Sequence, residues 1–170
     1  GTGYSDQWPQ HEVQIDAFYI DETEVTNAMY RQCVEQERCI APSSYKSSSR
    51  ISYYGNPAFD NYPVITVSWH HAEKYCAWAG RQLPTEAQWE YAARGTESRS
   101  YPWGEQFSCS RGNFDDETQK SDFVVEGGPD CDGYPDTAPV GSFRNGASFF
   151  GALDMAGNVW EWVADWYDPD

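Results

Sequence analysis

The stretch that most constrains this chain is residues 151–167, GALDMAGNVWEWVADWY. It turns at a Gly-Asn pair and then alternates, so an expected strand carries three indoles on one side and two acids on the other. The indoles are Trp160, Trp162 and Trp166, and the acids are Glu161 and Asp165. The indole face is either a wall of the core or a wall of a binding site. The acids either are merely solvated or, with the oxygen-rich turn before them, hold a hard cation such as calcium.

Composition and charge limit the classes of function. A chain of 170 residues is sized for one domain with a substantial core. Its 11 basic residues against 27 acidic ones give a net charge of −16, which argues against binding to nucleic acid or to anionic membrane surfaces. No apolar run approaches the roughly 18 residues of a membrane span. The 16% of aromatic residues predicts a core built on a few large rings among many loops.

The five cysteines predict a disulfide-bonded chain. Cys33 and Cys39 are close in sequence at the end of a helical pattern, Cys109 and Cys131 bracket a polar loop, and Cys76 has a core-facing helical position. We expect the disulfides Cys33–Cys39 and Cys109–Cys131 and a buried thiol at Cys76. Two disulfides indicate an extracytoplasmic chain, with thermophile cytosol as the known exception. No Cys-x-x-Cys pair or Cys/His cluster has the spacing of a zinc site.

Capping residues predict three helices, over residues 26–36, 68–80 and 85–95. The caps are Thr26, Ser68 and Thr85, the last in a capping box with Gln88. The inner stripe expected for the first helix consists of Met29, Tyr30, Cys33 and Val34.

Alternating or short apolar runs predict strands at residues 13–20, 63–67, 138–143 and 159–166. A long loop at residues 107–137 is expected to be either functional or tied down, here by the predicted disulfide and a bound cation. The loop at residues 39–62 either lines a binding surface with its tyrosines or is filled by them. These are Tyr45, Tyr53 and Tyr54.

Two pairs of polar residues are weak candidates for chemistry. His70 and His71 are adjacent, so they cannot share a metal as a pair four residues apart on a helix would. We interpret them as surface or interface residues. Glu86 and Glu90 resemble a pair of catalytic carboxylates, but the positive end of a helix dipole already explains Glu86.

Four motifs in register carry a family resemblance: RQLPTEAQWEYAARG, YPWG, TAPVGSF and the stretch at residues 151–167. Together they resemble the formylglycine-generating enzyme (sulfatase-modifying factor) family, and EVTNAMY resembles its first helix. The resemblance implies an α+β, C-type-lectin-like fold with little regular secondary structure. It also implies a single domain over residues 1–170, and we expect its C-terminal part to lie beyond Asp170.

The resemblance further implies two calcium ions. By motif position, the first is held by Asn113, the Phe114 carbonyl, Asp132 and the Tyr134 carbonyl. The second is held by Asp154, the carbonyls of Gly157 and Val159, and Glu161. The second set agrees with the oxygen-rich turn found from the residues alone.

The catalytic cysteines of the family have no counterpart here. Members that generate formylglycine oxidise a cysteine in a Cys-x-Pro-x-Arg peptide, using copper held by two cysteines C-terminal to the GNVWEW segment. None of the five cysteines matches these by position. The resemblance therefore implies the fold and calcium, but no catalytic residue in this chain.

Two functions follow from the resemblance. The first is a ligand- or protein-binding module, because the same fold serves as a sensor domain fused to kinases or other effectors. It also serves in the variable proteins of diversity-generating retroelements. The second is the N-terminal scaffold of a copper-dependent oxidase acting on sulfatases, with copper present only in the full-length parent. In either case we expect the partner to be a protein or a small molecule, or a fused or associated C-terminal fragment.

Overall fold

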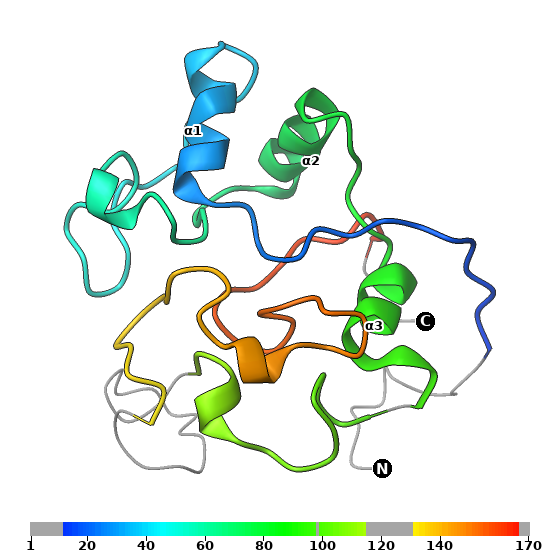
Figure 1. Cartoon of the computed structure of the whole chain (residues 1–170). Coiled ribbons are helices and arrows are strands. Elements are labelled where there is room, and N and C mark those ends of the chain that lie inside the picture. The colour runs from blue at the N-terminus through cyan, green and yellow to red at the C-terminus, as the bar shows by residue number, and fades with distance from the viewer. Residues whose placement is uncertain (1–11, 98, 115–130, 167–170) are drawn as a thin grey trace.

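The computed structural model describes residues 12–97, 99–114 and 131–166. Three α-helices stand out in these ranges: α1 (Asn27–Glu35), α2 (Trp69–Trp78) and α3 (Glu86–Arg94). Four short 3-10 helices accompany them: η2 (Pro57–Phe59), η3 (Gly95–Glu97), η4 (Cys109–Arg111) and η5 (Arg144–Gly146). Figure 1 shows α1 and α2 as neighbours, α3 apart from them, and long loops in between. None of the described helices has the length and apolar character needed to cross a bilayer.

The three predicted caps begin the three α-helices. The Thr26 hydroxyl accepts a hydrogen bond from the main-chain N–H of Met29 at 3.2 Å. Thr85 and Gln88 form the reciprocal capping box, with distances of 3.2 and 2.9 Å. At Ser68 the box is completed by a histidine side chain instead of an acid or an amide. Local hydrogen bonding at helix ends is therefore readable from this sequence.

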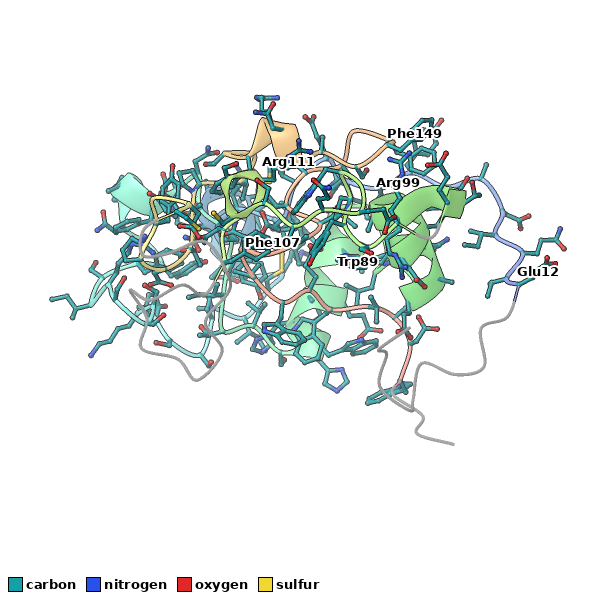
Figure 2. All side chains as sticks on the ribbon, turned by 90° about the horizontal axis from the view of Figure 1, so that it is seen from below. Glu12, Trp89, Arg99, Phe107, Arg111 and Phe149 are labelled. Atoms are coloured by element: carbon teal, nitrogen blue, oxygen red, sulfur yellow. A yellow bond between two sulfur atoms is a disulfide. The ribbon has the colours of Figure 1, made fainter. Side chains whose placement is uncertain are left out.

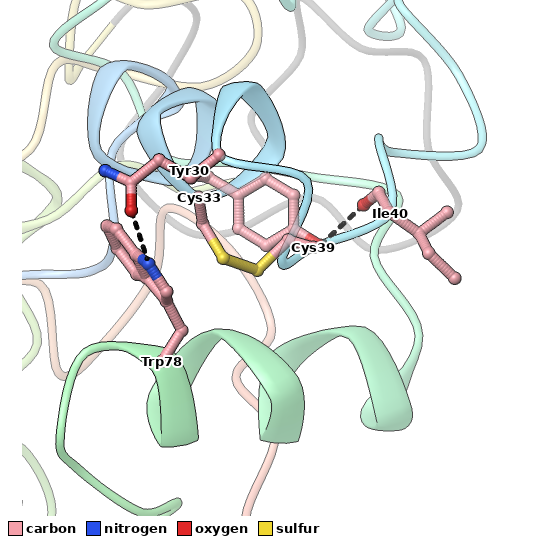
Figure 3. The surroundings of a disulfide bond; sticks show 6 residues. Tyr30, Cys33, Cys39, Ile40 and Trp78 are labelled. Atoms are coloured by element: carbon pink, nitrogen blue, oxygen red, sulfur yellow. Dashed lines mark hydrogen bonds between the residues drawn. A yellow bond between two sulfur atoms is a disulfide. The ribbon is translucent and has the colours of Figure 1, made fainter.

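The first core cluster joins α1 to α2 through tyrosine rings and the Cys33–Cys39 disulfide, which the sequence predicted. The Tyr30 and Tyr75 rings stack at 5.5 Å. The Tyr30 hydroxyl donates to the Ile40 carbonyl at 2.9 Å, which holds the loop after α1 against the helix (Figure 3). Met29 was wrongly placed on the inner stripe. It is 47% exposed, because the buried side of α1 is centred on Tyr30 and Cys33.

The structure does not form the predicted Cys109–Cys131 disulfide, since Cys109 carries a thiol. Cys109 opens η4, and the main chain of η4 packs against η5. A Cβ on Gly146 would lie only 1.8 Å from the Arg111 carbonyl oxygen. That contact holds the start of the long loop in place. The spacing of Cys109 and Cys131 in the sequence did not determine how far apart the two ends of the loop lie. Cys76 is a half-buried thiol, and burial raises its pKa.

None of the four predicted strands forms a ladder with another described segment. The described residues contain only isolated bridges, between Thr26 and Pro63 and between Tyr101 and Gly104. Residues 138–143 make a turn, in which the N–H of Ser142 donates to the Pro139 carbonyl. Alternation of apolar and polar residues predicts an extended segment. A β-strand also needs a second segment whose main chain can hydrogen-bond to it.

A second core cluster packs α3 against the turn at residues 152–155. Its buried members are Ala92, Ala93, Ala152 and Met155, and Phe18, Ile20 and Trp89 pack around them. The main-chain N–H of Glu86 donates to the Asp165 carboxylate at 2.6 Å, so an acid lies at the positive end of the α3 dipole. α3 thereby positions both the turn and the segment that follows it.

Candidate metal centre and adjoining groove

The turn at residues 154–158 is held in a conformation that few residues adopt. Asp154 and Asn158 have φ values of 58° and 62°, in the left-handed region that costs energy for a residue with a Cβ. The Asp154 carboxylate accepts a hydrogen bond from the N–H of Gly141, which fixes its direction. At Gly157, with φ of 101°, a Cβ would lie 2.3 Å from the Asn113 carbonyl oxygen. Glycine is therefore required for the close approach of the two loops.

This close approach brings the two predicted calcium sets together. The N–H of Asn158 donates to the Asn113 carbonyl at 2.7 Å. The Asn113 side-chain amide donates to the Asn158 side-chain oxygen at 3.1 Å. Residues 113 and 158, which belong to loops far apart in sequence, thus form one polar centre.

Members of the first predicted set converge on Asp132. Its carboxylate accepts hydrogen bonds from the main-chain N–H groups of Phe114 and Tyr134, at 2.8 and 2.9 Å. Asn113 is 6% exposed, and its Oδ1 has no hydrogen-bond donor among the described residues. A buried oxygen without a donor is costly unless something else satisfies it, and amide oxygens are calcium ligands. This oxygen fits the predicted ion.

An acid that sequence reasoning missed lies beside the second predicted set. Glu24 is 8% exposed, and neither of its carboxylate oxygens has a hydrogen-bond partner in the described part of the chain. Burial, followed by the negative charges of Asp154 and Glu161, raises the pKa of Glu24 to about 9. No role was predicted for Glu24 from the sequence. Nothing local in the sequence distinguishes it from the nearby Glu22, which is exposed.

Glu161 lies on the same side of the centre. The residue as a whole has exposed surface, and burial of its carboxylate raises its pKa to about 7. Asp154 raises this pKa further. The buried indole N–H of Trp89 lowers it without reaching hydrogen-bond geometry. Three carboxylates that raise one another's proton affinity are an arrangement that a divalent cation relieves.

Side chains alone do not form a metal cage here. Among the described residues, no group of three or more His, Cys, Asp or Glu side chains is arranged to hold an ion. Each predicted set instead combines two side chains with two main-chain carbonyls, a mixture that suits calcium better than zinc or copper.

The prediction that the three indoles form a wall of the core is wrong. Trp160 is fully exposed, and Trp162 and Trp166 are also exposed. The main chain of their segment is nevertheless anchored: the Trp69 indole donates to the Val163 carbonyl at 2.7 Å, and the Trp162 indole donates to the Val67 carbonyl at 3.0 Å. The alternative prediction, a wall of a binding site, remains open.

A groove of about 590 Å³ adjoins the acidic centre. Its walls come from residues 17–25, from α2 and the loop after it, and from residues 159–162. Most of the lining residues are apolar, but Glu24, Glu161 and the ion pair of Arg81 with Asp21 also border the groove. The volume lies within the range of sites for small ligands.

The remaining candidates have structural roles. The Glu90 carboxylate pairs with Arg94 at 2.6 Å, and Glu86 opens α3, so no catalytic pair forms there. His71 caps α2, and His70 lies on the surface near Glu73. Figure 2 shows Arg99 beside Phe149, where the guanidinium carbon lies 5.7 Å from the ring centre.

The fold and the site define a loop-rich domain in which turns from distant parts of the chain surround a buried acidic centre. The family model of the sulfatase-modifying factor enzyme 1-like domain matches residues 1–170. The chain therefore belongs to the sulfatase-modifying factor enzyme 1-like family, as the four motifs suggested.

Three comparisons show the range of this likeness. The chain is 34% identical to the formylglycine-generating enzyme of Streptomyces coelicolor, over 99% of this chain and 65% of that protein. It is 34% identical to the serine/threonine-protein kinase Pkn1 of Chlamydia trachomatis, over 100% of this chain and 26% of the kinase. The structure of PvdO from Pseudomonas aeruginosa superposes with a TM-score of 0.60 at 26% identity, covering 87% of this chain and 56% of that one. Domains of this family thus occur as parts of longer proteins.

Proposed function

We propose that this chain is a single calcium-stabilised domain that acts as a module for binding a protein or small-molecule ligand. The observation that carries the calcium proposal is the buried, unpartnered carboxylate of Glu24 beside Asp154 and Glu161. Leaving such a group without a counter-charge costs several kcal/mol. A bound cation removes that cost.

The residues that would hold calcium are the two predicted sets, with Glu24 added to the second. They are Asn113, Phe114, Asp132 and Tyr134 in the first, and Asp154, Gly157, Val159 and Glu161 in the second. The ion would supply positive charge between acids that repel one another. This chain's own residues hold the loops in place, through the Asn113–Asn158 hydrogen bonds and the contact of Gly157 with Asn113.

One comparison supports a binding role. A domain of this family occurs within a protein named as a kinase, which supports a sensor-like use. The Cys33–Cys39 disulfide supports an oxidising, extracytoplasmic setting.

The second candidate is the scaffold portion of a copper-dependent oxidase acting on sulfatase Cys-x-Pro-x-Arg motifs. It is favoured by the likeness to the Streptomyces coelicolor enzyme, of which this chain spans only 65%. Under this candidate, copper belongs to the longer parent.

Thermal unfolding with and without calcium tests the first proposal. A ligand that binds only the folded chain raises its melting temperature by mass action. We expect a chelator to lower the melting temperature and calcium to restore it. An unchanged melting temperature would refute the calcium assignment. Copper-dependent oxidation of a Cys-x-Pro-x-Arg peptide by the purified chain would refute the binding-module proposal in favour of an enzyme.

A further inference from the structure

Asn158 lies between Gly157 and Val159, the two main-chain ligands of the second predicted set, and belongs to neither set itself. Its main-chain N–H donates to the carbonyl of Asn113, a member of the first set, at 2.7 Å. The Gly157 carbonyl and the Asn158 N–H belong to one rigid peptide unit and point in opposite directions. The hydrogen bond to Asn113 therefore fixes where the Gly157 carbonyl points.

The side chain of Asn158 also orients the side chain of Asn113. The Asn113 Nδ2 donates to the Asn158 Oδ1 at 3.1 Å and to the Asp136 carbonyl at 2.6 Å. An amide nitrogen carries two hydrogens, so both are used. A flipped Asn113 amide would instead bring its oxygen against two acceptors. The orientation of Asn113 is thus fixed, and its Oδ1 is the atom left for the first ion.

One short segment, residues 136–141, supports both sets. Its Ala138 exchanges two hydrogen bonds with the Asn158 side chain: the N–H donates to Oδ1 at 2.9 Å, and the carbonyl accepts from Nδ2 at 3.3 Å. Its Gly141 donates to the carboxylate of Asp154, a member of the second set. The carbonyl of its first residue holds the amide of the first set, as described above. Ligands of both sets are therefore tied to the same piece of main chain.

We propose that Asn158 is a positioning residue that couples the two calcium sets, so that an ion bound at one set raises the affinity of the other. Asn113, once it binds an ion, is held in place. It then holds Asn158, and with it the Gly157 carbonyl, in a single arrangement. The second set therefore loses less conformational entropy when it binds its own ion. By reciprocity, the second set favours the first equally. Because this coupling needs both ions, it rests on the proposed function.

The charges of the two sets do not oppose this coupling. Among the described residues, the first set has one carboxylate, that of Asp132, and the second has three once Glu24 is included. With these acids ionised and a divalent ion bound, the first set carries a net positive charge and the second a net negative one. The two loaded sets thus escape the repulsion expected of two bare cations.

Calorimetric titration with calcium measures the coupling. Asp132→Asn disables the first set and Glu161→Gln disables the second, so each variant gives the association constant of one set alone. In the unsubstituted chain, we expect the overall constant for loading both ions to exceed the product of these two constants by about tenfold. An overall constant equal to the product would overturn the proposal.

Asn158→Gly tests whether the side chain of Asn158 carries the coupling. Asn158 has a φ of 62°, which glycine adopts without strain, so the change removes the side-chain hydrogen bonds and retains the main-chain N–H. We expect the excess over the product, measured in this background, to fall by about threefold or more. An unchanged excess would overturn the role of Asn158.

Thr66→Gly is the matched control. Thr66 also has positive φ, at 57°, and its hydroxyl bonds both main-chain groups of a distant residue, Ser44, at 3.2 and 3.1 Å. It belongs to neither set, so its replacement should leave the excess unchanged. Equal losses of the excess in Thr66→Gly and Asn158→Gly would assign the effect to general loosening and overturn the proposal. Melting temperatures check that both variants fold.

Amide exchange keeps the test independent of how Asn158→Gly folds. In the Glu161→Gln chain, we expect calcium bound at the first set to slow exchange of the Asn158 amide by about tenfold. Unchanged exchange there would overturn the proposed path. The two proposals fail separately: two ions that bind independently overturn only the coupling, whereas no calcium binding by any of these chains overturns the calcium-stabilised domain as well.

Discussion

Glu24 shows at the scale of one residue how burial gives an ordinary acid a special role. We expect Glu24→Gln to weaken calcium binding at least tenfold, which removes about 1.4 kcal/mol of calcium-linked stabilisation. The matched control is Glu22→Gln, two residues away, whose side chain is 68% exposed. Calorimetric titration with calcium checks both variants. Equal affinities for Glu24→Gln and the unsubstituted chain would remove Glu24 from the site.

Gly157 is the residue whose replacement isolates the contact between the two loops. Gly157→Ala forces a Cβ onto the Asn113 carbonyl oxygen, and we expect it to lower the free energy of unfolding by about 2–4 kcal/mol. Gly55→Ala is the control, because Gly55 also has positive φ but faces open space. It should cost only about 1 kcal/mol. Denaturant titration gives both values, and equal losses would show that backbone strain alone matters at Gly157.

At the scale of an element, the Cys33–Cys39 disulfide closes the loop that ends α1. Its six-residue separation corresponds to a loop-closure contribution of about 2 kcal/mol. We expect replacement of both cysteines by serine to lower the free energy of unfolding by at least that amount. Cys76→Ser is the control, since it replaces a cysteine at the first core cluster by serine without breaking a disulfide. A double variant as stable as this control would contradict the proposed role.

The helices of this fold were predictable from sequence, and the strands were not. A cap such as Thr26 or Thr85 hydrogen-bonds three residues ahead, so the sequence contains both partners of the interaction. A strand at residues 159–166 needs a partner elsewhere, and alternation does not say whether one exists. The ligand sets came from motifs, whereas Glu24 entered the site only through the folding of distant loops.

At the scale of the whole molecule, the acidic centre predicts a pH dependence of the calcium-free chain. The pKa of Glu24 is raised from 4.5 to about 9 and that of Glu161 to about 7. Between the ordinary pKa of a glutamate and these raised pKa values, the folded chain binds more protons than the unfolded chain. The free energy of unfolding therefore falls as pH rises from about 5 to about 9. Saturating calcium should flatten or reverse this trend, because the metal replaces the protons. Melting temperatures across this range check both statements.

The contacts that assemble the centre join residues far apart in the chain. Asn113 meets Asn158 across 45 positions, and Trp69 meets Val163 across 94. Chains dominated by such distant pairings fold slowly, because much of the loop entropy is lost before the pairing compensates for it. The joined loops of this domain thus set its kinetics as well as its shape: we expect refolding in milliseconds to seconds, well behind the microseconds of a helical bundle.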